Sequence, residues 1–149
     1  MERVSGVWSL RSRIKESKNK IIIAEENKRK LTIDNPSGKI IRKIQVDGCL
    51  PIKQGKRCDY MFEINVPQKP VTQVIYLELK GCDIEKAYEQ LIATINIFQA
   101  EHKGCNKECH IIASRVPKAG AKVQQLKVKI LKTKQAKLFV NTNKAVISV

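Results

Sequence analysis

The sequence has few acidic residues, few aromatic residues and no long apolar run. Acidic residues number 14 against 29 lysines and arginines, so the 149-residue chain has a formal net charge of +15. A charge of that size repels itself, and an anionic partner relieves the repulsion. Aromatic residues make up 5% of the chain, too few for the stacking platforms that bind single-stranded nucleic acid. The composition therefore predicts a protein that binds a polyanion, and it does not identify a more specific function.

Apolar runs in this chain are only a few residues long, for example at 21–23 and 74–77. A membrane-spanning helix needs about 20 apolar residues, so we expect no membrane partner. The first residues also lack the apolar segment of a secretion signal. We therefore expect a cytoplasmic protein whose five cysteines are reduced thiols, because disulfides rarely persist in that compartment.

Hydrophobic periodicity predicts a single α/β domain over residues 1–149. An amphipathic helix is expected over 4–14, and a helical turn then carries Glu25 and Glu26. Residues 31–33 and 40–46 lie on either side of an Asn-Pro-Ser-Gly turn and predict a hairpin.

The rest of the chain alternates between predicted strands and helices. Asp83 is suited to capping a helix that follows it, and the apolar residues from Ile84 to Phe98 form one stripe along that helix. A second, basic helix is expected over 119–135. The remaining elements are strands, expected at 57–66, 73–81, 109–116 and, around an Asn-Thr-Asn turn, 137–149.

Three charged residues lie on two strands that we expect to be neighbours. Glu78 and Lys80 share one face because they are two residues apart on a strand, and a hairpin between 57–66 and 73–81 places Asp59 beside them. Two carboxylates repel each other unless a cation lies between them, and such oxygen ligands suit Mg²⁺. We expect Asp59 and Glu78 to hold Mg²⁺, with Mn²⁺ as a substitute. Lys80 would orient the attacking water or stabilise charge that develops on the phosphate.

The Glu-x-Lys pattern is common in so charged a chain and occurs at 16–18, 26–28, 78–80 and 101–103. Three of these matches lie in polar stretches, where a solvated surface is a sufficient explanation. Only the match at 78–80 ends a strongly apolar strand, where charged groups are costly to bury without a purpose. This difference favours the catalytic interpretation for 78–80 alone.

The pattern Asp59…Glu78-x-Lys80, on a hairpin followed by an amphipathic helix, resembles the PD-(D/E)XK nuclease superfamily, which includes many restriction endonucleases and Holliday-junction resolvases. The resemblance covers about residues 20–116 and implies a restriction-endonuclease-like αβββαβ core, with a mixed central sheet flanked by helices. It implies a Mg²⁺-dependent nuclease that hydrolyses phosphodiester bonds in DNA, acting as a homodimer or in a larger defence or repair complex. Cys58 stands where the motif has proline.

The resemblance also implies outer residues of the site. Many members place a metal-binding glutamate on the first helix, a role for which we prefer Glu25 over Glu26, with Glu16 third. Some members carry a glutamine on the helix after Glu-x-Lys, and Gln90 occupies that place. An exposed helix glutamate and a solvent-facing amide are the ordinary alternatives.

Other polar residues compete for a role in metal binding. Asp47 precedes glycine, a pair typical of turns, and capping explains Asp83. Four zinc-type ligands fall within nine residues: His102, Cys105, Cys109 and His110. Their spacing is not that of a standard finger, and Cys109 and His110 should point to opposite faces of a strand. We therefore favour a metal-free segment.

Two other functions fit the sequence. A non-catalytic nucleic-acid-binding or assembly protein can retain the nuclease fold, and a ribosome-associated protein can be equally basic. The lysines of the last third, at positions 118, 122, 127, 129, 132, 134 and 137, suit phosphate contacts or a solvated cationic surface.

Overall fold

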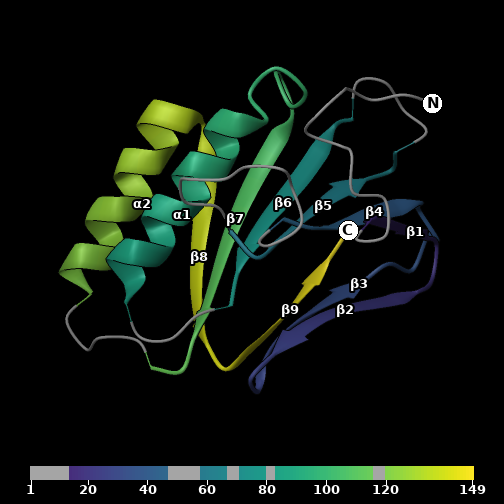
Figure 1. Cartoon of the computed structure of the whole chain (residues 1–149), viewed down its shortest axis with the longest axis horizontal. Helices are drawn as coiled ribbons and strands as arrows, with labels where there is room; N and C mark the ends of the chain where they lie inside the picture. The colour runs from purple at the N-terminus through teal and green to yellow at the C-terminus, as the bar shows by residue number, and fades with distance from the viewer. Residues whose placement is uncertain (1–13, 47–57, 67–70, 80–82, 116–119) are drawn as a thin grey trace.

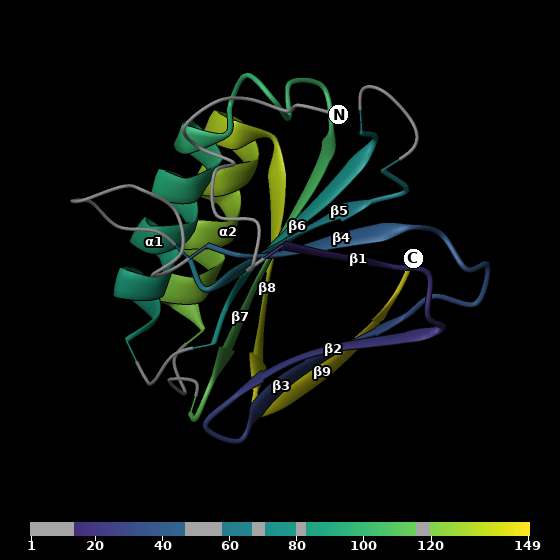
Figure 2. The same cartoon turned by 45° about the vertical axis from the view of Figure 1, so that its right-hand side comes forward.

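The computed structural model of the chain describes residues 14–46, 58–66, 71–79, 83–115 and 120–149. The elements of this part of the chain are β1 (Ile14–Ser17), β2 (Ile21–Glu26), β3 (Arg29–Asp34), β4 (Ile41–Gln45), β5 (Tyr60–Ile64), β6 (Gln73–Glu78), α1 (Ile84–Ile97), β7 (Asn106–Ala113), α2 (Ala121–Lys134), β8 (Ala136–Thr142) and β9 (Lys144–Ser148). They form three layers. Helices α1 and α2 lie together on one side of a six-stranded sheet, and β2, β3 and β9 form a second sheet on its other side (Figures 1 and 2).

The large sheet is mixed and has the strand order β1-β4-β5-β6-β7-β8. Strands β1, β4, β5 and β6 pair antiparallel, whereas β6, β7 and β8 pair parallel. Parallel neighbours need a crossover connection, which α1 and α2 supply. The predicted α/β class with a mixed sheet is confirmed. Both described helices lie on one face of this sheet and the small sheet covers the other face, so the restriction-endonuclease-like core stays a prediction.

The hairpin and the helix that were expected around the candidate site are present. Strand β5 pairs with β6 so that Tyr60 lies opposite Leu77. Helix α1 follows, and the Asp83 side chain accepts a hydrogen bond of 2.9 Å from the backbone N–H of Lys86, which confirms the predicted cap. These elements follow from local periodicity and capping.

The predicted helical turn at Glu25 and Glu26 is wrong, since both residues end strand β2. The β-branched residues at 21–23 favour a strand. Asn27 and Lys28, both with positive φ, form the two-residue connection that lets β2 pair with β3. The expected helix over 4–14 lies outside the described residues except for Ile14, which begins β1.

The predicted hairpin between 31–33 and 40–46 is also wrong. Strand β3 pairs with β2 and, in parallel, with β9, whereas β4 pairs with β1 and β5. The expected turn does exist: the Gly38 N–H donates to the Asn35 carbonyl at 3.1 Å, and Gly38 has a φ of +66°. It carries the chain from one sheet to the other instead of folding it back on itself.

The ends of the last strands also differ from expectation. Strand β7 begins at Asn106, three residues before the predicted start. After β8, Asn143 adopts a φ of +64°, and the chain continues into β9, which joins the small sheet beside β3.

Side chains alternate between two apolar clusters on the two faces of the large sheet. Val74 and Tyr76 of β6 pack with the helices, while Ile75 and Leu77 pack towards the small sheet. Strand β5 alternates in the same way, as predicted. Cys58 departs from this alternation: it lies in the helix-side cluster with Met61, because regular β5 begins only at Tyr60.

Candidate functional site

Asp59 and Glu78 lie side by side where β5 begins and β6 ends. The backbone N–H of Asp59 is 3.2 Å from Glu78 Oε1 and 3.1 Å from the Leu77 carbonyl. The backbone N–H of Leu79 donates to Asp59 Oδ2 at 2.8 Å. Glu78 has no exposed surface and Asp59 is 4% exposed. The hairpin thus brings the two acids together, as the sequence predicted, while their role as metal ligands stays a prediction.

Helix α1 holds the residue that precedes this acid pair. The Cys58 N–H donates to Thr94 Oγ1 at 2.7 Å, and the Thr94 hydroxyl donates to the Gln90 carbonyl at 2.9 Å. Thr94 is completely buried. Sequence reasoning overlooked Thr94, although a hydroxyl within the apolar stripe, next to Ile95, was a signal that could have identified it. Its bond ties the start of β5 to the helix.

Cys58 is buried close to the two acids. Burial raises the pKa of the Cys58 thiol, and the nearby charges of Glu78 and Asp59 raise it further, against the opposing effect of the Thr94 hydrogen bond. A thiol with a raised pKa carries little thiolate at neutral pH. Cys58 is therefore a packing residue here.

The remaining predicted site residues fall in different places. Gln90 is 8% exposed, so its solvent-facing alternative is wrong, and a supporting role stays a prediction. Lys80 and Asp47 lie outside the described residues.

Glu25 and Glu26, the two preferred first-helix acids, are exposed on strand β2. Glu16 is on β1 and bonds to Arg42. Within the described ranges, no group of three or more His, Cys, Asp or Glu side chains converges to hold a metal ion. The expected third acid therefore has no counterpart on a described helix, because the segment predicted to be helical pairs as a strand.

The four residues of the zinc-type spacing do not converge. His102 is held by Glu63 and Tyr76. The Cys105 thiol donates to a backbone carbonyl at 2.6 Å. Cys109 faces the helix-side cluster. His110 stacks on Phe139, with ring centroids 4.9 Å apart. Cys109 and His110 point to opposite faces, as alternation predicted, which excludes one zinc site built from all four residues.

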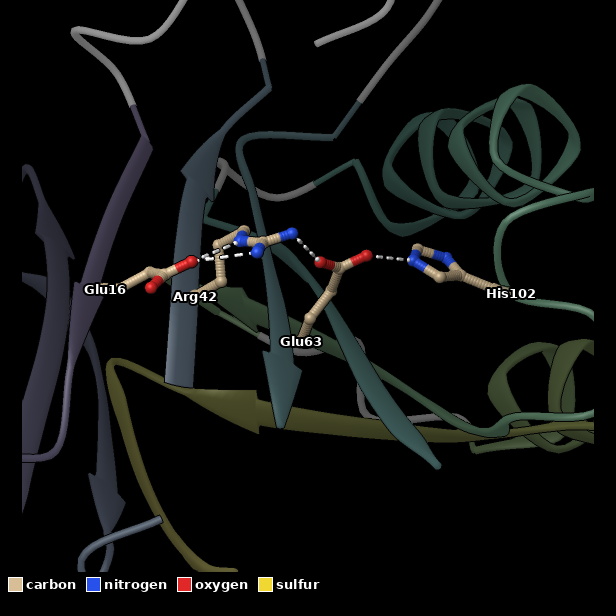
Figure 3. A network of polar contacts seen from close by, with 4 residues as sticks. All are labelled: Glu16, Arg42, Glu63 and His102. Carbon is tan, nitrogen blue, oxygen red and sulfur yellow. Dashed lines mark hydrogen bonds and ion pairs between the residues drawn. The ribbon is translucent and has the colours of Figure 1, made fainter. Parts of the chain in front are cut away.

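A second polar network crosses the large sheet on its helix side (Figure 3). Arg42 binds Glu16 at 2.8 Å and Glu63 at 3.1 Å, and Glu63 Oε2 lies 2.6 Å from His102 Nε2. The chain of bonds ends at Tyr76, whose hydroxyl is 2.7 Å from His102 Nδ1. The network links four strands to the connection between α1 and β7.

The chemistry of Tyr76 bears on the directions of these hydrogen bonds. Burial raises the pKa of the Tyr76 phenol, and neighbouring groups that include Cys109 add to this shift. The phenol is therefore protonated and can donate to His102 Nδ1, and in the tautomer with the ring proton on Nε2 His102 donates to Glu63. Glu63, Tyr76 and His102 are all completely buried. A substrate has no access to them, so we interpret the network as structural.

In the described parts of the chain, neither helix is long and apolar enough to cross a membrane. Comparisons with protein-family models, curated proteins and solved structures found no match to this chain. The resemblance to PD-(D/E)XK nucleases therefore stays a prediction, and the chemistry of the Asp59–Glu78 pair is the basis for a functional proposal.

Proposed function

We propose that the protein is a Mg²⁺-dependent nuclease that hydrolyses phosphodiester bonds in DNA, with a restriction-endonuclease-like core. The observation that supports this proposal is the buried Asp59–Glu78 pair at the adjoining ends of β5 and β6. The element order β4-β5-β6-α1-β7 agrees with the βββαβ order that the resemblance implies, and this agreement supports the proposal. A homodimer or a larger defence or repair complex stays a further prediction of the resemblance.

The donor set suits a hard divalent cation. Backbone N–H groups orient one oxygen of each carboxylate. Oxygen donors of this kind favour Mg²⁺, which retains waters and also binds substrate phosphate. When bound, the ion would polarise the phosphodiester and lower the pKa of a coordinated water. The protein would hold the ion with Asp59 and Glu78, and Lys80 would orient the water or stabilise developing charge.

The distribution of charge supports a polyanionic partner. The net charge of the chain is +15. Helix α2 contains five lysines and no acidic residue, and it buries only Val123, Leu126 and Ile130 of its apolar face. Its first turn is anchored to the start of α1 by an ion pair of 2.9 Å between Lys122 and Glu85. The first turn of this lysine-rich helix follows β7 in the chain, and its lysines suit phosphate contacts.

The test is cleavage of a panel of linear, branched and single-stranded DNAs with Mg²⁺ or Mn²⁺. Wild type is compared with Asp59→Asn, Glu78→Gln and Lys80→Ala. The expected result is cleavage by wild type and a loss of at least about 100-fold in each variant, the scale seen when one group that stabilises a transition state is removed. Mn²⁺ titration followed by electron paramagnetic resonance tests the acid pair without cleavage.

Asp34→Asn is the matched control, since Asp34 is a partly buried strand carboxylate in the small sheet. It should cleave like wild type. Equal activity of wild type, Asp59→Asn and Lys80→Ala would disprove the proposal. An RNA substrate added to the panel tests the choice of DNA.

A second function is favoured by one observation. Asp59 and Glu78 are almost fully buried, and both accept hydrogen bonds from backbone amides, as acids with a purely structural role do. We propose as the alternative a nucleic-acid-binding or assembly protein without catalysis. Metal-independent binding by wild type, with no cleavage of any substrate, would support this alternative.

A further inference from the structure

Arg29 extends from the small sheet to the carboxyl ends of β6 and β7 in the large sheet, close to the acid pair. It is the first residue of β3. Its Nε donates to the Leu79 carbonyl at 3.2 Å, and its Nη1 donates to Ser114 Oγ at 2.8 Å. Leu79 follows β6 and Ser114 follows β7, so the guanidinium lies across the carboxyl ends of these two parallel strands.

This position is one residue away from the candidate ligands. Leu79 directly follows Glu78, and its N–H is bound by the Asp59 carboxylate while its carbonyl is bound by Arg29. The peptide groups on either side of Leu79 are therefore held from two directions. Of the two described groups that bond to the Leu79 backbone, the Asp59 carboxylate is an anion and the Arg29 guanidinium is a cation.

The charge of Arg29 has no carboxylate partner in the described ranges. Both of its acceptors are neutral, and it makes no ion pair there with Glu26, its cross-strand neighbour. Arg29 is partly buried, and a partly desolvated cation is stabilised by an anion. A guanidinium has five N–H donors, of which the two bonds use only two.

We propose that Arg29 binds a phosphate group of the nucleic acid at the carboxyl edge of β6 and β7, next to the Asp59–Glu78 pair. The identity of the ligand rests on the proposed function. A planar guanidinium suits two oxygens of one phosphate. Exposed Arg115 follows Ser114 in the chain, and Lys30 and Lys144 are register partners in the small sheet. Of these, only Arg115 adds a cation beside Arg29, because Lys30 and Lys144 are on the outer face of the small sheet, away from the large one.

The experiment measures DNA binding by the full chain in EDTA, which keeps cleavage out of the readout. The affinity of wild type, Arg29→Gln and Arg29→Lys for a short duplex is determined over a series of salt concentrations. Loss of one phosphate contact lowers the slope of log K against log salt by about 0.9. We expect that decrease for Arg29→Gln, whereas Arg29→Lys retains the charge and the slope. Lys103→Gln removes an exposed cation near the opposite end of β7 and should leave the slope unchanged.

If Arg29 only joins the two sheets, Arg29→Gln would lower the stability of the protein and leave the salt dependence of DNA binding unchanged. An unchanged slope in folded Arg29→Gln would overturn the proposal. If Arg29→Gln does not fold, labelling of wild-type protein with phenylglyoxal decides: DNA should protect Arg29, and equal labelling with and without DNA would overturn the contact. If wild type binds DNA but never cleaves it, the proposed nuclease function is wrong. The salt dependence of binding would still show whether Arg29 contacts a phosphate.

Discussion

His102 Nε2 lies 2.6 Å from Glu63 Oε2, although 39 residues separate the two in the chain and neither side chain is exposed. Glu63 also binds Arg42, and His102 Nδ1 is also hydrogen-bonded to the Tyr76 hydroxyl. The pair therefore closes a network in which each buried polar group has a partner. It fastens the connection between α1 and β7 to the centre of the large sheet.

Removal of His102 should destabilise the protein strongly. His102→Ala leaves the buried Glu63 carboxylate and the Tyr76 hydroxyl without their shared partner, and breaking a buried network of this kind costs about 3 kcal/mol. Urea unfolding followed by circular dichroism measures the change. The neighbouring exposed residue provides the control, Lys103→Ala, which should stay within about 0.5 kcal/mol of wild type. A loss below about 1 kcal/mol for His102→Ala would show that the network contributes little.

Thr94 should support the start of β5 through its hydroxyl. Thr94→Val preserves the shape but leaves the buried Cys58 N–H without its acceptor, so we expect a loss of about 1–3 kcal/mol. Thr94→Ser retains the oxygen and should recover most of this stability. Thermal unfolding compares the two variants, and equal losses for valine and serine would contradict the hydrogen-bond explanation. If the protein is a nuclease, Thr94→Val should also cleave more slowly than its folded fraction predicts.

The thiols of Cys58 and Cys109 should react slowly in the native protein. Burial raises the pKa of both thiols, and Cys58 also faces Glu78 and Asp59. The thiolate is the reactive form, so a raised pKa lowers its population at any given pH. Alkylation by iodoacetamide at mildly alkaline pH, mapped by mass spectrometry, measures the rates. Protein unfolded in urea is the control, and equal rates in native and unfolded protein would refute the prediction.

Glu108 should make stability depend on pH in the acidic range. The hydrogen bond from His110 lowers the pKa of Glu108, and the charges of His110 and Lys137 lower it further, against the effect of burial. The folded state therefore binds fewer protons than the unfolded state. The stabilisation is present above the ordinary pKa of glutamate, about 4.3, and is lost as pH falls through the lower folded value.

Unfolding of wild type and Glu108→Gln at a series of acidic pH values measures this contribution. The difference in stability between the two proteins should shrink as the pH falls. A difference that is constant across the series would contradict the predicted linkage. Glu101→Gln, a change of a partly buried acid in the connection after α1, is the matched control.

Local features of the sequence were sufficient to predict the β5–β6 hairpin, helices α1 and α2, and the proximity of the two acids. The apolar residues of 73–78 specify a buried strand, and Asp83 ends the connection with a helix cap. A strand period of two and a short connection then bring Asp59 next to Glu78. Each of these inferences depends on residues that are close in sequence, where periodicity and capping are reliable.

Contacts between distant segments decided the rest. Glu25 and Glu26 look like helix residues locally, yet β2 is a strand because it pairs with β3, which in turn pairs with β9 from the end of the chain. The bond between Glu63 and His102, and the reach of Arg29 to Leu79 and Ser114, join segments 39, 50 and 85 residues apart. The sequence by itself determined local periods, turns and caps. Only the tertiary structure decided which sheet each strand joins and which buried charges meet, because these depend on non-local pairing and shared desolvation.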